Sequence, residues 1–231
     1  MADAAYCPER SGPMKVEIYS DIACPWCYIG HKRFRTALEE LSPDERPEVV
    51  FRPYQLDPTL PQTPVPVKER LRERYGDLSD SMTRQAAEVG AQEGLEMRFD
   101  IAQAVNTFTA HRLLHHALSE YGAETQGALA EKLFESHFSE GANVADPVYL
   151  ADAAARVGMD KARTEAFLAS SEGRDAVRRG IEYAQRLGIR AVPTFVFDSR
   201  YAVQGAHPTD TFRGILEEIT SAADASQDAG G

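Results

Sequence analysis

Two cysteines separated by two residues are the part of this sequence best suited to chemistry. They are Cys24 and Cys27, with Pro25 and Trp26 between them. The thiolate is the reactive form of cysteine, and a free cysteine, with a pKa of about 8.5, is mostly a thiol at neutral pH. A helix N-terminus stabilises a thiolate through unpaired backbone N–H groups and the helix dipole. Pro25 suits the first helical position, so Cys24 is predicted to be the exposed nucleophile and Cys27 the resolving thiol.

A CxxC pair is also half of a zinc site, but such a site needs a second pair of cysteines or histidines. The only other cysteine is Cys7, in a polar N-terminal stretch, and the histidines at 111, 115 and 116 lie far away in sequence. We therefore expect no metal site and no bound cofactor, because the dithiol can serve as its own redox centre. Cys7 is expected to be dispensable.

Composition limits the partners. The chain has 231 residues, a formal net charge of −11 and a pI near 5.0, which argues against nucleic acid and anionic membrane surfaces. No apolar run is long enough to span a bilayer. Residues 1–13 lack the basic start and apolar stretch of a signal peptide. We expect a cytoplasmic protein with no nucleic-acid or membrane partner.

Alternating and helical patterns place the CxxC motif in a β-α-β unit. Lys15 to Ser20 alternates as a strand does, a helix is predicted from Pro25 to about Leu41, and Glu48 to Tyr54 is predicted to be a second strand. Within the helix, His31 follows the dithiol by one turn and is expected to be a solvated residue. A proline-rich stretch from Asp57 to Pro66 resembles a linker.

The middle of the chain is helical in pattern, and strand character returns near the end. Helices are predicted at about 67–75, 80–93, 106–121, 124–139, 147–157, 161–169 and 172–187, with no convincing strand among them. Thr194–Phe197 and Tyr201–Gln204 form a predicted hairpin, and a last helix starts near Pro208.

These patterns predict an α/β fold with a thioredoxin-like core (β-α-β … β-β-α) and a large all-helical insertion. We assign residues 14–64 and 188–222 to the core and residues 65–187 to the helical insertion domain. Residues 1–13 are expected to form a flexible extension and residues 223–231 a disordered tail, because both are small and polar.

Four short motifs resemble the FrnE-like branch of the DsbA family of thiol–disulfide oxidoreductases. Ser20 to Gly30 reads SDIACPWCYIG, Asn106 to Leu113 reads NTFTAHRL, Val192 to Phe195 reads VPTF and Gly205 to Pro208 reads GAHP. Together they run through nearly the whole folded chain. The resemblance implies a thioredoxin core with a helical insertion, in agreement with the pattern.

The resemblance also implies roles for residues around the dithiol. It implies a cis peptide bond between Val192 and Pro193, on a strand that continues through Thr194 and pairs with substrate chains beside the cysteines. Pro25 and Trp26 would flank the redox site. On the insertion helix, Asn106 and His111 would line a substrate groove, together with Thr107 and Arg112. The alternative for these helix residues is a cap at Asn106 and packed or solvated side chains elsewhere.

Three functions remain open. The leading one is exchange of the Cys24–Cys27 dithiol and disulfide with thiol- or disulfide-containing proteins or small molecules. The second is a kappa-class glutathione transferase or chromene-carboxylate isomerase, although these relatives carry serine where Cys24 stands and a Ser-Asp pair where this chain has Ala206-His207-Pro208. The third is a redox sensor or a binding protein for an aromatic, polyketide-type metabolite. The oligomeric state is left open, a homodimer included.

Overall fold

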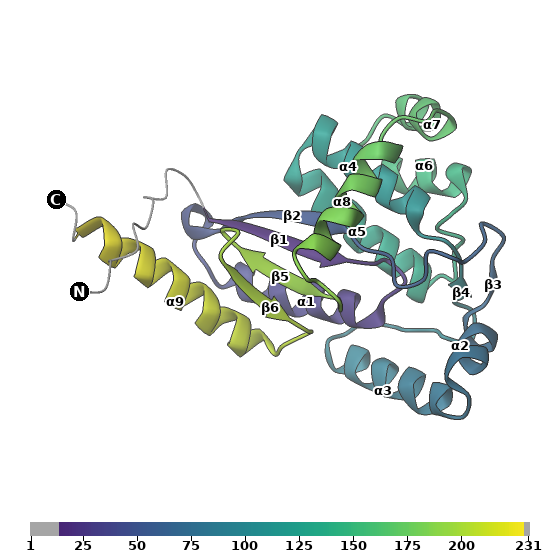
Figure 1. Ribbon diagram of the computed structural model, residues 1–231, viewed down its shortest axis with the longest axis horizontal. Coiled ribbons are helices and arrows are strands. Elements are labelled where there is room, and N and C mark those ends of the chain that lie inside the picture. The colour runs from purple at the N-terminus through teal and green to yellow at the C-terminus, as the bar shows by residue number, and fades with distance from the viewer. Residues whose placement is uncertain (1–13, 229–231) are drawn as a thin grey trace.

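The computed structural model describes residues 14–228, with side chains up to residue 221. Its elements follow the predicted order: a β-α-β unit, a helical block and a β-β-α unit (Figure 1). Cys7 and the predicted extension 1–13 lie outside the described residues, as do residues 229–231. The structure confirms the α/β class and places the CxxC motif in the first unit.

Four strands form the central sheet in the order β2-β1-β5-β6. Strands β1 (Lys15–Ser20) and β2 (Glu48–Pro53) are parallel, whereas β5 (Thr194–Phe197) and β6 (Tyr201–Gln204) form an antiparallel hairpin that joins the sheet where β5 pairs with β1. This pairing brings the segment before β5 next to the end of β1. The CxxC motif and the Val192–Phe195 motif, far apart in the chain, therefore meet at one end of the two central strands.

Helices α1 (Pro25–Glu39) and α9 (Thr209–Asp228) cover one face of the sheet. Phe34 of α1 is buried with its ring centroid 5.1 Å from that of Phe195 in β5 and 5.3 Å from that of Phe212 in α9. Aromatic rings contribute large apolar areas and prefer such tilted or edge-to-face contacts. These three rings hold the helix that carries the dithiol against the sheet.

Helix α8 (Arg174–Arg186) covers the opposite face of the sheet (Figure 1). Its buried residues are Val177 and Ala184, and Ala184 packs with Tyr19 of β1 and Val196 of β5. This helix lies in the range 65–187 assigned to the insertion, and its apolar side chains pack against the sheet. A mostly charged helix with a narrow apolar stripe is amphipathic, and here that stripe packs against the sheet.

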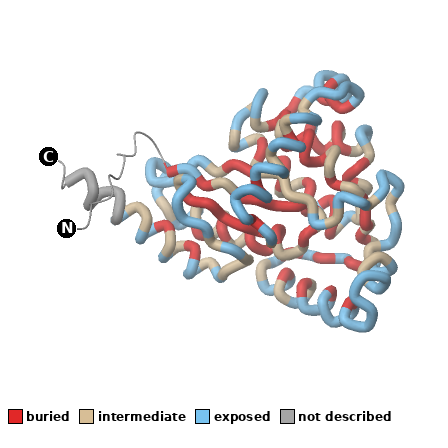
Figure 2. The backbone as a smooth tube through the Cα atoms, in the orientation of Figure 1, coloured by how far each residue is buried: buried red, intermediate tan, exposed pale blue. Residues whose placement is uncertain are grey.

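The remaining long helices form the insertion and share one continuous core with α1 and the sheet (Figure 2). Tyr28 of α1 stacks on Phe134 with 5.3 Å between ring centroids. Buried Gln126 exchanges hydrogen bonds of 2.8 and 3.0 Å with the backbone of Phe51 and so pairs with the free edge of β2. The insertion helices are α2 (Val67–Tyr75), α3 (Leu78–Gln92), α4 (Phe108–Tyr121), α5 (Ala123–Phe138), α6 (Pro147–Arg156) and α7 (Lys161–Ala169).

Two details of the regular structure differ from the sequence pattern. The insertion is not entirely helical, because β3 (Val65–Pro66) pairs with β4 (Gln103–Ala104) in a short antiparallel ladder. A two-residue strand is too short to show an alternating pattern. The last helix continues to Asp228 through the predicted disordered segment, whose alanines favour helix.

A short 3₁₀ turn at Pro43–Glu45 follows α1. In residues 14–228, no helix is both long and apolar enough to cross a membrane.

Two histidines are buried in the shared core without a hydrogen-bond partner, His31 of α1 and His137 of α5. The expectation that His31 is solvated is wrong, because its ring packs against Phe51 and Phe134. Burial, helped by nearby cations, lowers the pKa of His31 to about 3. Burial also lowers the pKa of His137 to about 4, against the opposing effect of Asp21.

These histidines are expected to make the fold sensitive to acid. Both pKa values lie below the unfolded value of about 6.5, so the unfolded chain binds more protons as pH falls, and stability drops by up to about 1.4 kcal/mol per pH unit for each histidine. The loss starts near pH 6.5 and continues toward pH 4. Urea unfolding at intervals from pH 7.5 to pH 5 measures this slope. His31→Phe should make this slope shallower, and an unchanged slope in His31→Phe would contradict this account.

Candidate active site

Cys24 occupies the N-cap of α1, where the predicted helix start requires it. Its backbone is extended, with φ −94° and ψ 114°, and Pro25 takes the first helical position. The Cys24 amide donates to the Asp21 carbonyl at 3.0 Å, and the Cys24 carbonyl accepts from the Cys27 amide at 3.0 Å. These bonds fix the turn that carries the β1 chain into α1. The Cys24 sulfur therefore stands beside the unpaired N–H groups of a helix N-terminus.

Both cysteines are thiols, and both are buried. Cys24 is 4% exposed and Cys27 is 2% exposed, so the expectation of an exposed Cys24 is wrong. The Cys24 thiol donates to the Val192 carbonyl over 3.7 Å, and this contact covers it. Burial, followed by the hydrogen bond and charge of Cys24, raises the pKa of Cys27 well above its ordinary value. Cys27 is therefore held in the thiol form at neutral pH.

Alkylation is expected to modify Cys24 before Cys27. Because the raised pKa of Cys27 leaves it almost entirely protonated at pH 6–7, and only thiolates react quickly, iodoacetamide should label Cys24 at least about tenfold faster. Peptide mass spectrometry of the reduced Cys7→Ser protein at successive times measures both rates. Faster labelling of Cys27 would reverse the roles assigned to the two cysteines.

The loop before β5 forms the other wall of the site. The Val192–Pro193 peptide bond is cis, and the Thr194 hydroxyl donates to the Ala191 carbonyl at 2.8 Å, which closes the loop. Gly30 of α1 faces this loop, since a Cβ atom built there would lie 3.0 Å from Cγ of Pro193. A side chain at position 30 would push the loop away from α1. The glycine three residues after Cys27 therefore permits the close approach of the two motifs.

The remaining predicted site residues fall into two groups. Pro25 and Trp26 are half-buried beside the dithiol, and Trp26 packs against the main core. Asn106 does not face a groove with free polar atoms. Its amide nitrogen donates to the carbonyls of Pro58 and Leu60, at 3.1 and 3.0 Å, and its Oδ1 accepts from the Phe108 amide at 2.9 Å. Asn106 thus ties the linker to the start of α4.

Arg112 is also structural rather than a groove residue. It is 1% exposed and donates to the backbone carbonyls of Phe167, Leu168, Ser170 and Glu172, at 2.8 to 3.4 Å. These carbonyls lie at and just beyond the C-terminal end of α7, where a helix leaves carbonyls unpaired. The guanidinium therefore caps α7.

His111 lies behind the turn from Asp21 to Cys24, which we call the active-site loop. It is too deeply buried for a protein substrate to touch. Its Nε2 atom is 3.6 Å from Oδ1 of Asp21, and both side chains are 2% exposed. Sequence reasoning missed Asp21 and Ser20, although both lie in the motif that ends in Cys24. Their signal was weak, because a polar residue in a turn is usually structural.

A pocket of about 130 Å³ opens beside the active-site loop. Ala23, which precedes Cys24, and the apolar side chains of Leu56 and Leu60 form part of its wall. Arg70 lines it too and pairs with Asp57 at 2.8 Å. The pocket thus has apolar walls and an ion-paired arginine, and it reaches Ala23, the residue before Cys24. Within residues 14–228, no group of three His, Cys, Asp or Glu side chains is placed to hold a metal ion.

Known proteins resemble this chain over almost its whole length. The DSBA-like thioredoxin domain matches residues 15–217. A probable DsbA oxidoreductase from Streptomyces coelicolor is 34% identical, with a TM-score of 0.81 and 90% of each chain covered. The uncharacterized protein YwbO of Bacillus subtilis is 25% identical over 205 residues, 88% of this chain and 96% of its own length.

A more distant structure shares the fold. The cytosolic disulfide reductase DsbM from Pseudomonas aeruginosa, solved with GSH, is 19% identical, with a TM-score of 0.63 and coverage of 90% of this chain and 99% of that one. The family match includes both cysteines, the insertion and the loop at Pro193. This chain belongs to the DsbA-like thioredoxin-domain family.

Proposed function

We propose that this protein is a thiol–disulfide oxidoreductase that exchanges a Cys24–Cys27 dithiol and disulfide with protein or small-molecule thiols. The observation that carries the proposal is the placement of two unpaired thiols in the first turn of α1, with Cys24 at the N-cap. The raised pKa of Cys27 supports a division of labour in which Cys24 reacts with the substrate and Cys27 follows.

The exchange needs no cofactor. When the protein is reduced, Cys24 attacks a substrate disulfide and forms a mixed disulfide, which Cys27 then resolves by attacking Cys24; when it is oxidised, a substrate thiolate attacks Cys24 and the steps run in reverse. The direction in the cell depends on the potential of the Cys24–Cys27 pair against that of its partner. A serine in place of Cys24 would favour a transferase, but this chain has both thiols.

The substrate would enter between the Val192–Pro193 loop and the pocket beside Ala23. The Val192 carbonyl faces Cys24 and offers a backbone acceptor to an extended peptide or a small thiol. The apolar side chains of Leu56 and Leu60 in this pocket suit the apolar part of a thiol-containing ligand. Glutathione and cysteine-containing peptides fit this chemistry. We infer a cytoplasmic setting, where thiols of this kind are abundant.

A redox titration tests the proposal. Reduced Cys7→Ser protein is equilibrated with glutathione mixtures of defined ratio, and Trp26, the single tryptophan, reports the state of the flanking cysteines by fluorescence. We expect one two-electron transition, with a mass loss of two hydrogens on full oxidation. Cys24→Ser and Cys27→Ser should show no such transition. Failure of the parent protein to form an intramolecular disulfide in excess oxidised glutathione would reject the proposal.

A further inference from the structure

A groove lined by three arginines lies on the face of the sheet opposite α1. It has a volume of about 330 Å³ and lies where α8 covers the strands β1 and β2 (Figure 1). Arg52 of β2 lines it, as do Arg179 and Arg186 of α8. The whole chain carries a net charge of −11, so this concentration of guanidinium groups differs from the average of the chain.

The two arginines of α8 are free to bind an anion. They are seven residues apart, so they share one face of the helix about two turns from each other. Tyr183 lies between them on that face and also lines the groove. The Arg186 guanidinium lies 5.8 Å from the centroid of the Tyr183 ring. Among the side chains that the structure describes, no carboxylate forms an ion pair with Arg179 or Arg186.

The strand side of the groove adds an ion pair. Arg52 is bound to Glu17 at 2.6 Å, and both line the groove. Burial, followed by the charges of Arg52 and Arg179, lowers the pKa of His115, so both guanidinium groups lie near that ring. Glu182 of α8 is exposed and does not line the groove. With one carboxylate against three guanidinium groups, the groove is positive and attracts anions.

A buried hydroxyl without a partner lies in the same groove. Tyr19 of β1 lines it and is 1% exposed, and its hydroxyl has no hydrogen-bond partner. Burial, helped by Glu17, raises the pKa of Tyr19 to about 12, so the hydroxyl keeps its proton and can donate. An unpaired buried polar group often marks the place of a bound ion or water molecule. Tyr183, which is 48% exposed, can move aside and admit an anion to this hydroxyl.

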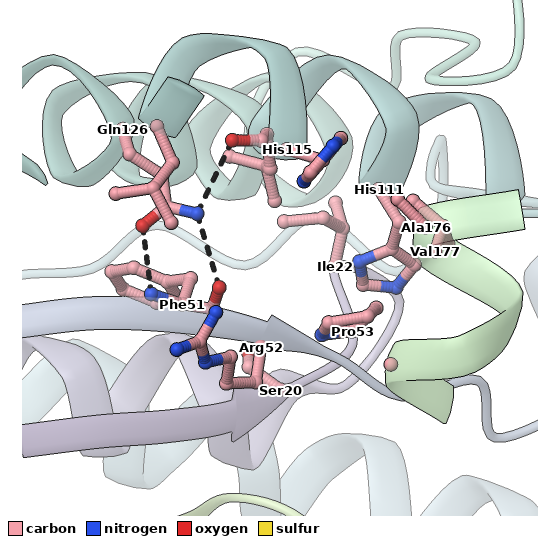
Figure 3. Close-up of a pocket in the computed structure, with 13 residues that line it drawn as sticks. Ser20, Ile22, Phe51, Arg52, Pro53, His111, His115, Gln126, Ala176 and Val177 are labelled. Carbon is pink, nitrogen blue, oxygen red and sulfur yellow. Dashed lines mark hydrogen bonds between the residues drawn. The ribbon is translucent and has the colours of Figure 1, made fainter. Parts of the chain in front are cut away.

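Both walls of the groove are fixed by packing and hydrogen bonds. Gly180 permits α8 to approach β2 closely, since a Cβ atom there would lie 2.8 Å from Cγ of Pro53. On the strand side, Phe51 precedes Arg52 and exchanges hydrogen bonds of 2.8 and 3.0 Å with Gln126 (Figure 3). Donors carried by such regular, anchored elements keep their positions before a ligand binds.

We propose that this groove is a second binding site, for a small organic anion that carries phosphate or carboxylate groups. Arg179 and Arg186 supply charge-assisted hydrogen bonds, and the Tyr19 hydroxyl supplies a further donor. A volume of about 330 Å³ lies within the range of small-molecule sites. Because α8 and α1 cover opposite faces of the sheet, the anion does not touch Cys24 or Cys27. The proposal therefore does not depend on the exchange function.

Isothermal titration calorimetry of the reduced full chain measures this binding, with pyrophosphate and citrate as probes. At an ionic strength of about 20 mM, which limits screening, we expect one probe to bind with a Kd below about 1 mM. The tighter probe shows whether the site prefers phosphate or carboxylate oxygens. Arg179→Gln and Arg186→Gln should each weaken binding about fivefold or more, and the double variant about 30-fold or more.

Three matched variants separate a built site from general surface charge. Arg178→Gln removes the same charge from α8, but Arg178 pairs with Asp175 at 3.3 Å and does not line the groove, so binding should change less than about twofold. Tyr19→Phe removes only the unpaired hydroxyl and should weaken binding about threefold or more without loss of stability in urea. Cys24→Ser should bind the probes as the parent protein does, even though it loses exchange.

Three results would overturn the proposal. The first is no binding of either probe at concentrations up to about ten times the expected Kd. The second is an equal loss of affinity in Arg178→Gln and Arg179→Gln, which would show attraction to the charge of α8 in general. The third is parental affinity in Tyr19→Phe, which would show that exposed arginines alone attract the anion. Failure of the exchange function leaves all three measurements unchanged.

Discussion

Cys27→Ser is expected to stall exchange with the substrate bound to Cys24, whereas Cys24→Ser is expected to form no adduct at all. The reason is the position of the two thiols. Cys24 stands at the N-cap of α1, next to the Val192 carbonyl where the substrate would enter. Cys27 lies beneath it, and its intramolecular attack is the fast exit from a mixed disulfide. Without it, the adduct should accumulate to most of the protein.

The rates should separate the variants further. A serine hydroxyl without an activating base is a far weaker nucleophile than a thiolate, so Cys24→Ser should lose at least about 1,000-fold in disulfide reduction. Each variant is purified from cells and run on a non-reducing gel with and without dithiothreitol, and adducts are mapped by mass spectrometry. Cys7→Ser is the matched control and should behave as the parent. Absence of reductant-sensitive adducts on Cys24 in Cys27→Ser would exclude this mechanism.

Arg112→Met is expected to be among the most destabilising single substitutions in the chain, by about 3–5 kcal/mol. The Arg112 guanidinium donates to four carbonyls at the end of α7 and stacks on the Phe167 ring at 5.1 Å. Methionine fills similar space but removes the donor that the carbonyls of Leu168, Ser170 and Glu172 share. Urea unfolding at pH 7 gives the change in the free energy of unfolding.

Two controls identify the cause of that loss. Arg112→Lys keeps the charge but cannot reach four carbonyls with one ammonium group, so it should recover less than half of the stability. Arg163→Met removes an exposed arginine of α7 that pairs with Glu120 at 3.4 Å, and should cost less than about 1 kcal/mol. If Arg112→Met were as stable as Arg163→Met, the capping role of Arg112 would be wrong.

Local patterns in the sequence were sufficient to predict the fold and to identify the Cys24–Cys27 dithiol. Cys24 and Cys27 were identified because residue type and spacing alone define a CxxC at a helix start, and Pro25 marks that start. The strands at 15–20, 194–197 and 201–204 agree with the prediction, because each has a local pattern of period two or a bounded apolar run. The resemblance in four short motifs indicated the family.

Burial and long-range contacts were not visible in the sequence, because they depend on which faces meet. The helical pattern of α8 would be the same whether it packed in the insertion or on the central sheet. Only its contact with Tyr19 and Val196 shows that it packs on the sheet. His31 looked like a solvated helix residue until α5 packed over it. Cys24 was expected to be exposed, but the Val192 carbonyl, far away in the chain, covers its sulfur.

The sequence by itself determined where the CxxC pair is and which cysteine comes first at the helix start, since both follow from neighbouring residues. Only the tertiary structure decided what surrounds that pair. The carboxylate of Asp21 meets His111 because the insertion folds back on the active-site loop, and the two residues share no local pattern. A pairing of this kind depends on the packing of whole helices, and single-chain periodicity carries no information about it.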